Sequence, residues 1–235
     1  MSGDDAGPIE QREWPSELLA HAVATNGTER RLHGYDVERD LARNYEFSET
    51  LLLALTGELP ADATSHAFGA ALTFASAMSV AEAPVHAAVV ARLCGVRTGG
   101  VLAIGTIALG EHVDTLLRGI GAALDDSSTR ELPIELRAQD AAERASVGHL
   151  RSAIGPSLDV PFLAMDPSRD VAIVAVLRAC GLTTALQIGA ALSVARLPSV
   201  LAECVATKPG DFKNYPMDTP HFEYDAAKPP QSAAT

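Results

Sequence analysis

GYDVERDLARNYEFSETLLLALTGELP, residues 34 to 60, is the stretch that decides the fold of this 235-residue chain. Ser48 followed by Glu49 is typical of a helix start, because a serine side chain can accept a hydrogen bond from a first-turn backbone N–H. Gly57 is expected just past the helix end, and Pro60 blocks continuation. Apolar side chains recur in between at helical spacing and form one stripe, at Leu51, Leu52 and Leu55. The stretch therefore predicts a short buried helix.

Composition favours packed helices and argues against two classes of partner. Apolar residues make up 47% of the chain and aromatic residues only 5%. Ala, Leu and Val dominate the apolar set, which suits close helix packing better than a β-sandwich. The net charge of −12 comes without a compensating run of Lys or Arg, so nucleic acid and anionic membranes are not indicated as partners.

Cysteine usage and the first residues of the chain predict a cytoplasmic protein. Cys94, Cys180 and Cys204 are widely spaced and flanked by apolar residues, so we expect buried, reduced thiols. Residues 1–12 are polar and acidic, unlike a secretory signal. The longest apolar run, Val101 to Leu109, is too short and too interrupted by glycine to cross a bilayer.

The pattern between the two ends is helix after helix, and no run alternates apolar and polar residues, so we predict an all-α fold. We expect disordered ends at residues 1–12 and 225–235 and one helical domain over residues 13–224. Pro198 is expected to separate the last two helices. The expected helices are 62–78, 84–93, 101–124, 134–154, 170–180, 184–196 and 198–205.

The quoted stretch resembles the N-terminal signature of the citrate synthase family. The resemblance rests on a turn at Gly34-Tyr35-Asp36, where glycine permits a positive φ, on the leucine helix, and on the stop at Thr56-Gly57-Glu58-Leu59-Pro60. It extends from Trp14 to Tyr224 and is strongest to the short citryl-CoA lyase-like branch. It implies a citrate synthase-like helical bundle with a reduced small domain over residues 125–170.

Family chemistry forms or cleaves a carbon–carbon bond between acetyl-CoA and a 2-oxo acid such as oxaloacetate. The resemblance thus implies a coenzyme A thioester as a substrate and no permanently bound cofactor. Such a reaction needs a carboxylate that takes a proton from the thioester methyl group and a neutral donor to the enolate oxygen. It also needs arginines that hold the carboxylates of the oxo acid.

Three residues match the family's site positions. His112 follows an Ala- and Gly-rich helix where the family places the histidine that donates to the thioester carbonyl, although Val113-Asp114-Thr115 replaces the family's Gly-Gly-Ala. Asp170 stands at the position of the family's catalytic base, and Arg196 matches an arginine that binds a substrate carboxylate.

Each of the three also has a structural alternative. His112 could be an ordinary histidine near a helix end with an acidic neighbour. Asp170 could be a helix N-cap that favours the helix dipole. Arg196 could form an internal salt bridge.

Two further histidines are candidates for binding the oxo acid. The family's Asp-His-Gly falls where this chain has Ala77-Met78, and His86 lies a few residues later. The family's middle Gly-x-Gly-His segment is missing around Leu132-Pro133, and His149 is a candidate replacement. In the tail, Asn214-Tyr215 replaces an arginine that the neighbouring protomer would lend.

Metal and phosphate chemistry is not indicated. The seven histidines include no His-x-x-x-His or His-x-His ligand pair, so we expect no metal. The chain has no Walker-type loop, no Gly-x-Gly-x-x-Gly loop and no Gly-x-Ser-x-Gly elbow.

The aromatic segment 211–224 is expected to lie over its own domain or over a partner subunit. The resemblance implies that it crosses to the other protomer, so we expect a homodimer, or else a longer paralogous subunit as partner. Two alternatives to the family reaction stay open. One is a catalytically impaired homologue that binds coenzyme A or serves as a partner subunit. The other is altered specificity, since a smaller or less anionic acceptor would need fewer arginines.

Overall fold

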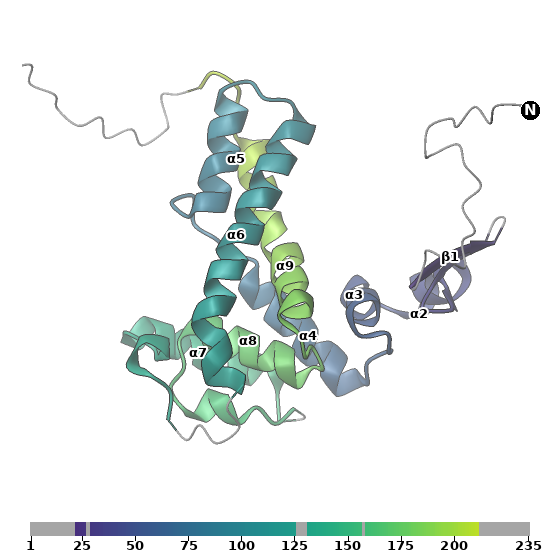
Figure 1. The fold of residues 1–235 in the computed structure, drawn as a ribbon, viewed down its shortest axis with the longest axis vertical. Coiled ribbons are helices and arrows are strands. Elements are labelled where there is room, and N and C mark those ends of the chain that lie inside the picture. The colour runs from purple at the N-terminus through teal and green to yellow at the C-terminus, as the bar shows by residue number, and fades with distance from the viewer. Residues whose placement is uncertain (1–21, 27–28, 126–130, 157, 212–235) are drawn as a thin grey trace, which may run out of the picture.

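The computed structural model describes residues 22–26, 29–125, 131–156 and 158–211, and within them the fold is predominantly helical (Figure 1). The predicted disordered ends and the aromatic residues beyond Asp211 lie outside the described residues. The elements are β1 (Val23–Asn26), β2 (Glu29–Leu32), β3 (Tyr35–Asp36), a π-helical turn (Val37–Leu41), α2 (Ala42–Asn44), α3 (Phe47–Thr56), α4 (Asp62–Ala75), α5 (Ala83–Leu93), α6 (Thr98–Asp125), a 3₁₀ turn (Ile134–Leu136), α7 (Ala141–Ile154), a second 3₁₀ turn (Pro161–Ala164), α8 (Arg169–Ala179) and α9 (Ala185–Ala206).

Helix α3 confirms the short buried helix predicted from the leucine stretch. Leu52 and Leu53 are buried, and the helix ends at Gly57 with φ of +83°. The predicted start at Ser48 was wrong, because a capping box that begins two residues earlier, at Glu46, satisfies the first backbone N–H groups. The Glu46 side chain accepts the backbone N–H of Glu49, and the Glu49 side chain accepts the backbone N–H of Glu46.

A small antiparallel sheet, in the order β1-β2-β3, precedes the helices and was missed by the sequence analysis. Its strands are only two to four residues long, too short for an alternating pattern to be visible. Gly34, with φ of +87°, makes the predicted turn between β2 and β3. The Asp36 carboxylate then accepts the backbone N–H groups of Arg39 and Glu38, and these bonds hold the pKa of Asp36 below its usual value.

The core is organised around α8, whose residues Val171 to Leu177 are all buried. In Figure 1, α6 and α9 run side by side, α5 lies along α6, and α8 crosses near the lower end of α6. Small residues allow α6 to approach α9 and α5 closely. A Cβ added at Gly105 of α6 would lie 2.7 Å from Val200 Cγ1 of α9 and 3.4 Å from the Ala88 Cβ of α5. The three-helix contact therefore depends on the missing side chain at Gly105.

Three predicted helix boundaries were wrong. Pro198 lies inside α9 instead of ending a helix. A proline inside a helix loses one backbone donor and crowds the carbonyl four residues earlier. Tertiary contacts hold this part of α9 in spite of that, since Val200 is buried and Ser199 Oγ donates to the carbonyl of Ser76. Helix α7 begins at Ala141, because Asp140 caps the N–H of Glu143. Helix α4 ends at Ala75 rather than at residue 78.

The cysteines differ from one another. Cys180 is buried, and burial raises the pKa of its thiol to about 12, so it stays protonated at neutral pH. Cys204 is half-buried, but Cys94 is exposed, so the prediction of three buried thiols was wrong for Cys94.

Two helices are long and apolar enough to cross a membrane by length and composition, Thr98–Gly121 of α6 and Ala185–Ala206 of α9. From the sequence, the longest apolar run, Val101 to Leu109, was expected to be too short to cross a bilayer. The apolar helix is longer than that run, because α6 continues through its glycines as one helix. Core helices of globular proteins pass the same test, and here α6 and α9 pack against each other. The predicted domain limits and the cytoplasmic location stay predictions.

The contact at Gly105 yields a matched pair of variants. We expect Gly105→Val to lower the free energy of unfolding by roughly 1–3 kcal/mol, because the added carbons must displace Val200 and Ala88. Gly119→Ala in the same helix has no atom within 4 Å of the new Cβ, and we expect a gain of up to about 1 kcal/mol. Urea unfolding measures both, and equal effects of the two variants would contradict the close packing.

Candidate active site

His112 lies in the middle of α6, not near a helix end as one alternative supposed. Its side chain is 29% exposed, and its Nε2 lies 4.0 Å from Oε2 of Glu82. Glu82 precedes the first residue of α5, and its other oxygen accepts the backbone N–H of Ser79. The imidazole is thus held between α6 and the start of α5, with a carboxylate beside one ring nitrogen.

Asp170 lies in the first turn of α8 but does not cap it. Ser168 is the N-cap, and its side chain accepts the N–H of Val171. The capping alternative for Asp170 was therefore wrong, since the neighbouring serine takes that role. The Asp170 carboxylate is left to contact other helices, and 37% of its side chain is exposed.

Arg196 is the buried charged side chain of the described residues, with 4% of it exposed. Its Nη2 donates to Oδ1 of Asp170 at 2.8 Å, so the internal salt bridge expected as an alternative is present. Its Nε and Nη1 are buried and have no partner within the described part of the chain. A buried N–H group without an acceptor is costly, so the bond to Asp170 satisfies this guanidinium only in part.

A cavity of about 480 Å³ joins two of the predicted residues. Helices α6 and α8 bring His112 and Asp170 to the same cavity, and Arg196 stands behind Asp170 through the salt bridge. The structure thus brings together an imidazole, a carboxylate and a guanidinium from three helices. The lining residues are Ala83, Ala108, Glu111, His112, Thr115, Leu116 and Asp170.

The two further histidine candidates do not join this group. His86 on α5 and His149 on α7 are both exposed, and neither is among the described residues that line the cavity. Sequence reasoning instead missed Glu82, Glu111 and Thr115. Thr115 could have been found as a neighbour of His112 at position i+3 of one helix, whereas Glu111, at i−1, gave no such signal because adjacent residues do not face each other on a helix. Glu82 comes from another helix and gave no local signal.

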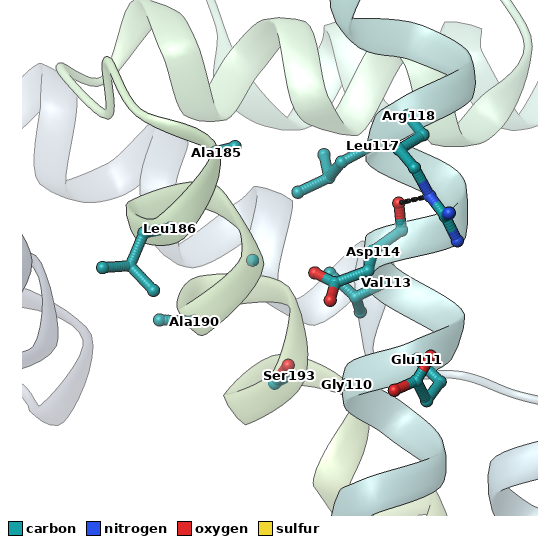
Figure 2. Close-up of a pocket in the computed structure, with 11 residues that line it drawn as sticks. Gly110, Glu111, Val113, Asp114, Leu117, Arg118, Ala185, Leu186, Ala190 and Ser193 are labelled. Carbon is teal, nitrogen blue, oxygen red and sulfur yellow. Dashed lines mark hydrogen bonds between the residues drawn. The ribbon is translucent and has the colours of Figure 1, made fainter.

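A second, larger hollow of about 750 Å³ lies between α6 and α9 (Figure 2). The Asp114 and Leu117 side chains of α6 extend toward α9 across it, and Ala190 and Ser193 are among the residues that line it from α9. The Arg118 guanidinium is held on its own helix, by the carbonyl of Asp114 and the hydroxyl of Thr115. Among the residues that the structure describes, no group of three His, Cys, Asp or Glu side chains could hold a metal ion.

Two solved structures share the arrangement of these helices. Citryl-CoA lyase from Hydrogenobacter thermophilus matches 94% of this chain and 97% of its own, with a TM-score of 0.61 and 18% sequence identity. The chain has a citryl-CoA lyase fold. ATP citrate lyase from Methanothrix soehngenii, solved with citrate and coenzyme A, matches 84% of this chain and 40% of its own, with a TM-score of 0.61 and 13% identity.

No protein-family model and no curated protein sequence matches the chain. At these low sequence identities, the likeness to the two solved structures shows a shared fold and nothing more. This confirms the predicted citrate synthase-like helical bundle, and the small sheet β1-β2-β3 is an addition to it.

We expect the loss of Asp170 and the loss of Arg196 to affect the free energy of unfolding differently. Asp170→Ala leaves the Arg196 guanidinium buried without its carboxylate, and we expect a loss of roughly 1–3 kcal/mol, less than for a fully buried pair because Asp170 is part-exposed. Arg196→Met, of similar size, should leave stability unchanged or higher. Asp159→Ala, at an exposed position, is the control. Urea unfolding in which Asp170→Ala matched the control would contradict this account of the pair.

Proposed function

We propose that the protein forms or cleaves a carbon–carbon bond between acetyl-CoA and a 2-oxo acid. The observation that carries the proposal is the shared cavity of His112 and Asp170, with Arg196 bound to Asp170. These are the three groups that enolate chemistry requires, namely a hydrogen-bond donor, a base and a cation. The fold shared with citryl-CoA lyase and ATP citrate lyase is in keeping with this reaction.

In this proposal, Asp170 takes a proton from the methyl group of the thioester. Arg196 holds Oδ1 of that carboxylate, which orients the other oxygen toward the cavity. His112 donates a hydrogen bond to the thioester oxygen as it becomes an enolate. Coenzyme A enters as a substrate thioester and not as a resident cofactor.

A second candidate is an impaired relative that binds coenzyme A or serves as a partner subunit. The observation that favours it is the absence of His86 and His149 from the cavity. Loss of one donor to a developing oxyanion typically raises the barrier by about 2.7–4 kcal/mol. Without compensation, two missing donors would leave little turnover.

We also propose that the protein is a homodimer in which a second copy covers the outer face of α6 and α9. Only 22% of the apolar window in α6 and 33% of that in α9 is buried within one chain. Both helices expose large apolar side chains, at Ile104 and Ile107 of α6 and at Leu186, Val194, Leu201 and Val205 of α9. An exposed apolar patch of this kind is typical of a protein–protein interface. A longer paralogous subunit is the other possible occupant.

Proton exchange of acetyl-CoA in deuterated buffer tests the chemistry without knowledge of the oxo acid. We expect the full chain to exchange the methyl protons, as measured by mass spectrometry. Asp170→Asn should slow exchange at least about 100-fold, because the base is lost while the amide oxygen still accepts from Arg196. Asp159→Asn should exchange like the unaltered protein. Calorimetric binding of coenzyme A without exchange would support the impaired relative. Neither binding nor exchange would overturn the proposed reaction and leave only the partner-subunit form of the second candidate.

The proposed interface is tested by the mass of the protein in solution. We expect Ile107→Glu, which places a charge in the middle of the exposed stripe, to convert the dimer to a monomer in sedimentation experiments. Ile134→Glu is the matched control, because Ile134 is equally exposed but lies on the 3₁₀ turn outside the stripe. A monomer before substitution would contradict the dimer.

A further inference from the structure

A cavity of about 570 Å³ lies at the connection between α5 and α6 and shares none of its described lining residues with the cavity of His112. Two arginines line it, one near the end of α5 and one just before α6, and the first residues of α6 complete it. Its volume is within the roughly 300–1,000 Å³ of ordinary ligand pockets. The lining residues are Arg92, Arg97, Thr98, Gly99 and Gly100.

The two guanidiniums at this cavity have no anionic partner in the described part of the chain. Arg92 is half-buried and Arg97 is exposed, and neither has a hydrogen bond or an ion pair with a described residue. The chain carries 30 Asp and Glu against 18 Lys and Arg, yet no carboxylate is among the described residues of this lining. Two like charges at one cavity repel each other and favour an anion between them. The cavity is thus a basic site on an acidic protein.

The groups at this cavity suit phosphate oxygens. Each guanidinium presents a fork of N–H donors that matches two oxygens of a phosphate. Thr98 adds a hydroxyl donor, and the first N–H groups of α6 have no acceptor within the helix. A Cβ placed at Gly99 would have no atom within 4 Å, so an oxygen can approach the backbone there. A helix start alone is a common feature, and the two unpaired guanidiniums are what single out this one. A diphosphate, which carries more than one negative charge, balances them better than a single carboxylate does.

The basic cavity is within reach of the candidate active site along α6. Gly100 lines the basic cavity and Glu111 lines the cavity of His112, and the two residues are 11 positions apart. This spacing is about three helical turns, so they lie on the same side of α6 and about 16 Å apart along it. The arm of coenzyme A between its sulfur and its first phosphate has about 13 bonds and extends to roughly 16 Å at about 1.2 Å per bond. A thioester beside His112 can therefore place its diphosphate at Arg92 and Arg97.

We propose that the cavity of Arg92 and Arg97 binds the diphosphate group of a small ligand, either coenzyme A or a free nucleotide. The diphosphate site stands without the proposed function, whereas coenzyme A as the carrier of the diphosphate rests on that function. No covalent bond is made or broken in this cavity. Its role is to hold the ligand through two charged side chains at the start of α6.

Isothermal titration calorimetry of the full-length chain tests the site, with pyrophosphate and ADP as probes. We expect both to bind with a Kd of roughly 1 mM or below. Arg92→Gln and Arg97→Gln should each raise the Kd at least about tenfold, because each removes one charged fork. Arg43→Gln removes the same charge at an exposed position of α2 and should leave the Kd unchanged. Equal Kd values in Arg97→Gln and Arg43→Gln, or no binding by the unaltered chain, would overturn the site.

Gly99→Leu tests the cavity without a change of charge. The new side chain has room, since a Cβ at Gly99 contacts nothing within 4 Å, and it takes up space beside the guanidiniums. We expect the melting temperature to stay close to that of the unaltered chain and the Kd for ADP to rise at least about tenfold. Unchanged binding of ADP would place the ligand elsewhere and overturn the proposal.

Coenzyme A and acetyl-CoA distinguish the two carriers. If coenzyme A is the carrier, it should displace ADP, and Arg97→Gln should raise the KM for acetyl-CoA in methyl exchange at least about tenfold with little effect on kcat. Binding of ADP that coenzyme A does not displace would assign the site to a free nucleotide and overturn coenzyme A as the carrier. Absence of exchange, with ADP still bound, would overturn the proposed reaction and leave the diphosphate site standing.

Discussion

The salt bridge between Arg196 and Asp170 is the contact on which the site depends. A guanidinium with 4% of its surface exposed needs an acceptor, and the first turn of α8 supplies it. Desolvation makes the buried guanidinium costly without its carboxylate, and the pair joins α9 to α8. The same bond sets the position of the Asp170 carboxylate at the edge of the cavity that His112 also lines. One salt bridge thus both joins two helices and positions the carboxylate of the candidate site.

Close helix packing brings the third group to the site. Helix α6 can approach α9 and α5 because Gly105 has no side chain, and His112 lies two turns further along α6. Because α6 is one continuous helix, its packing at Gly105 also constrains the position of His112. The same two helices leave large apolar side chains exposed on their outer face. Helices α6 and α9 therefore carry His112 and Arg196 as well as the proposed subunit interface.

The local signals in the sequence were sufficient for several elements and failed where tertiary contacts decided. Gly57 ends α3 as predicted, because a left-handed residue past a helix end is a local requirement. Pro198 did not end a helix, because buried Val200 and the bond from Ser199 to Ser76 hold that part of α9. The strands β1 to β3 are stabilised by pairing with each other, and so short a pattern was invisible in the chain alone.

The sequence by itself determined that the chain is helical, where most helices lie, and which three side chains match the family's site positions. Helical periodicity, caps and charge are properties of neighbouring residues, so they can be read along the chain. Only the tertiary structure decided that His112 and Asp170 share a cavity, that His86 and His149 do not, and that Glu82 and Glu111 make the cavity acidic. These relations join residues far apart in sequence, and they exist only because the helices pack in one particular arrangement.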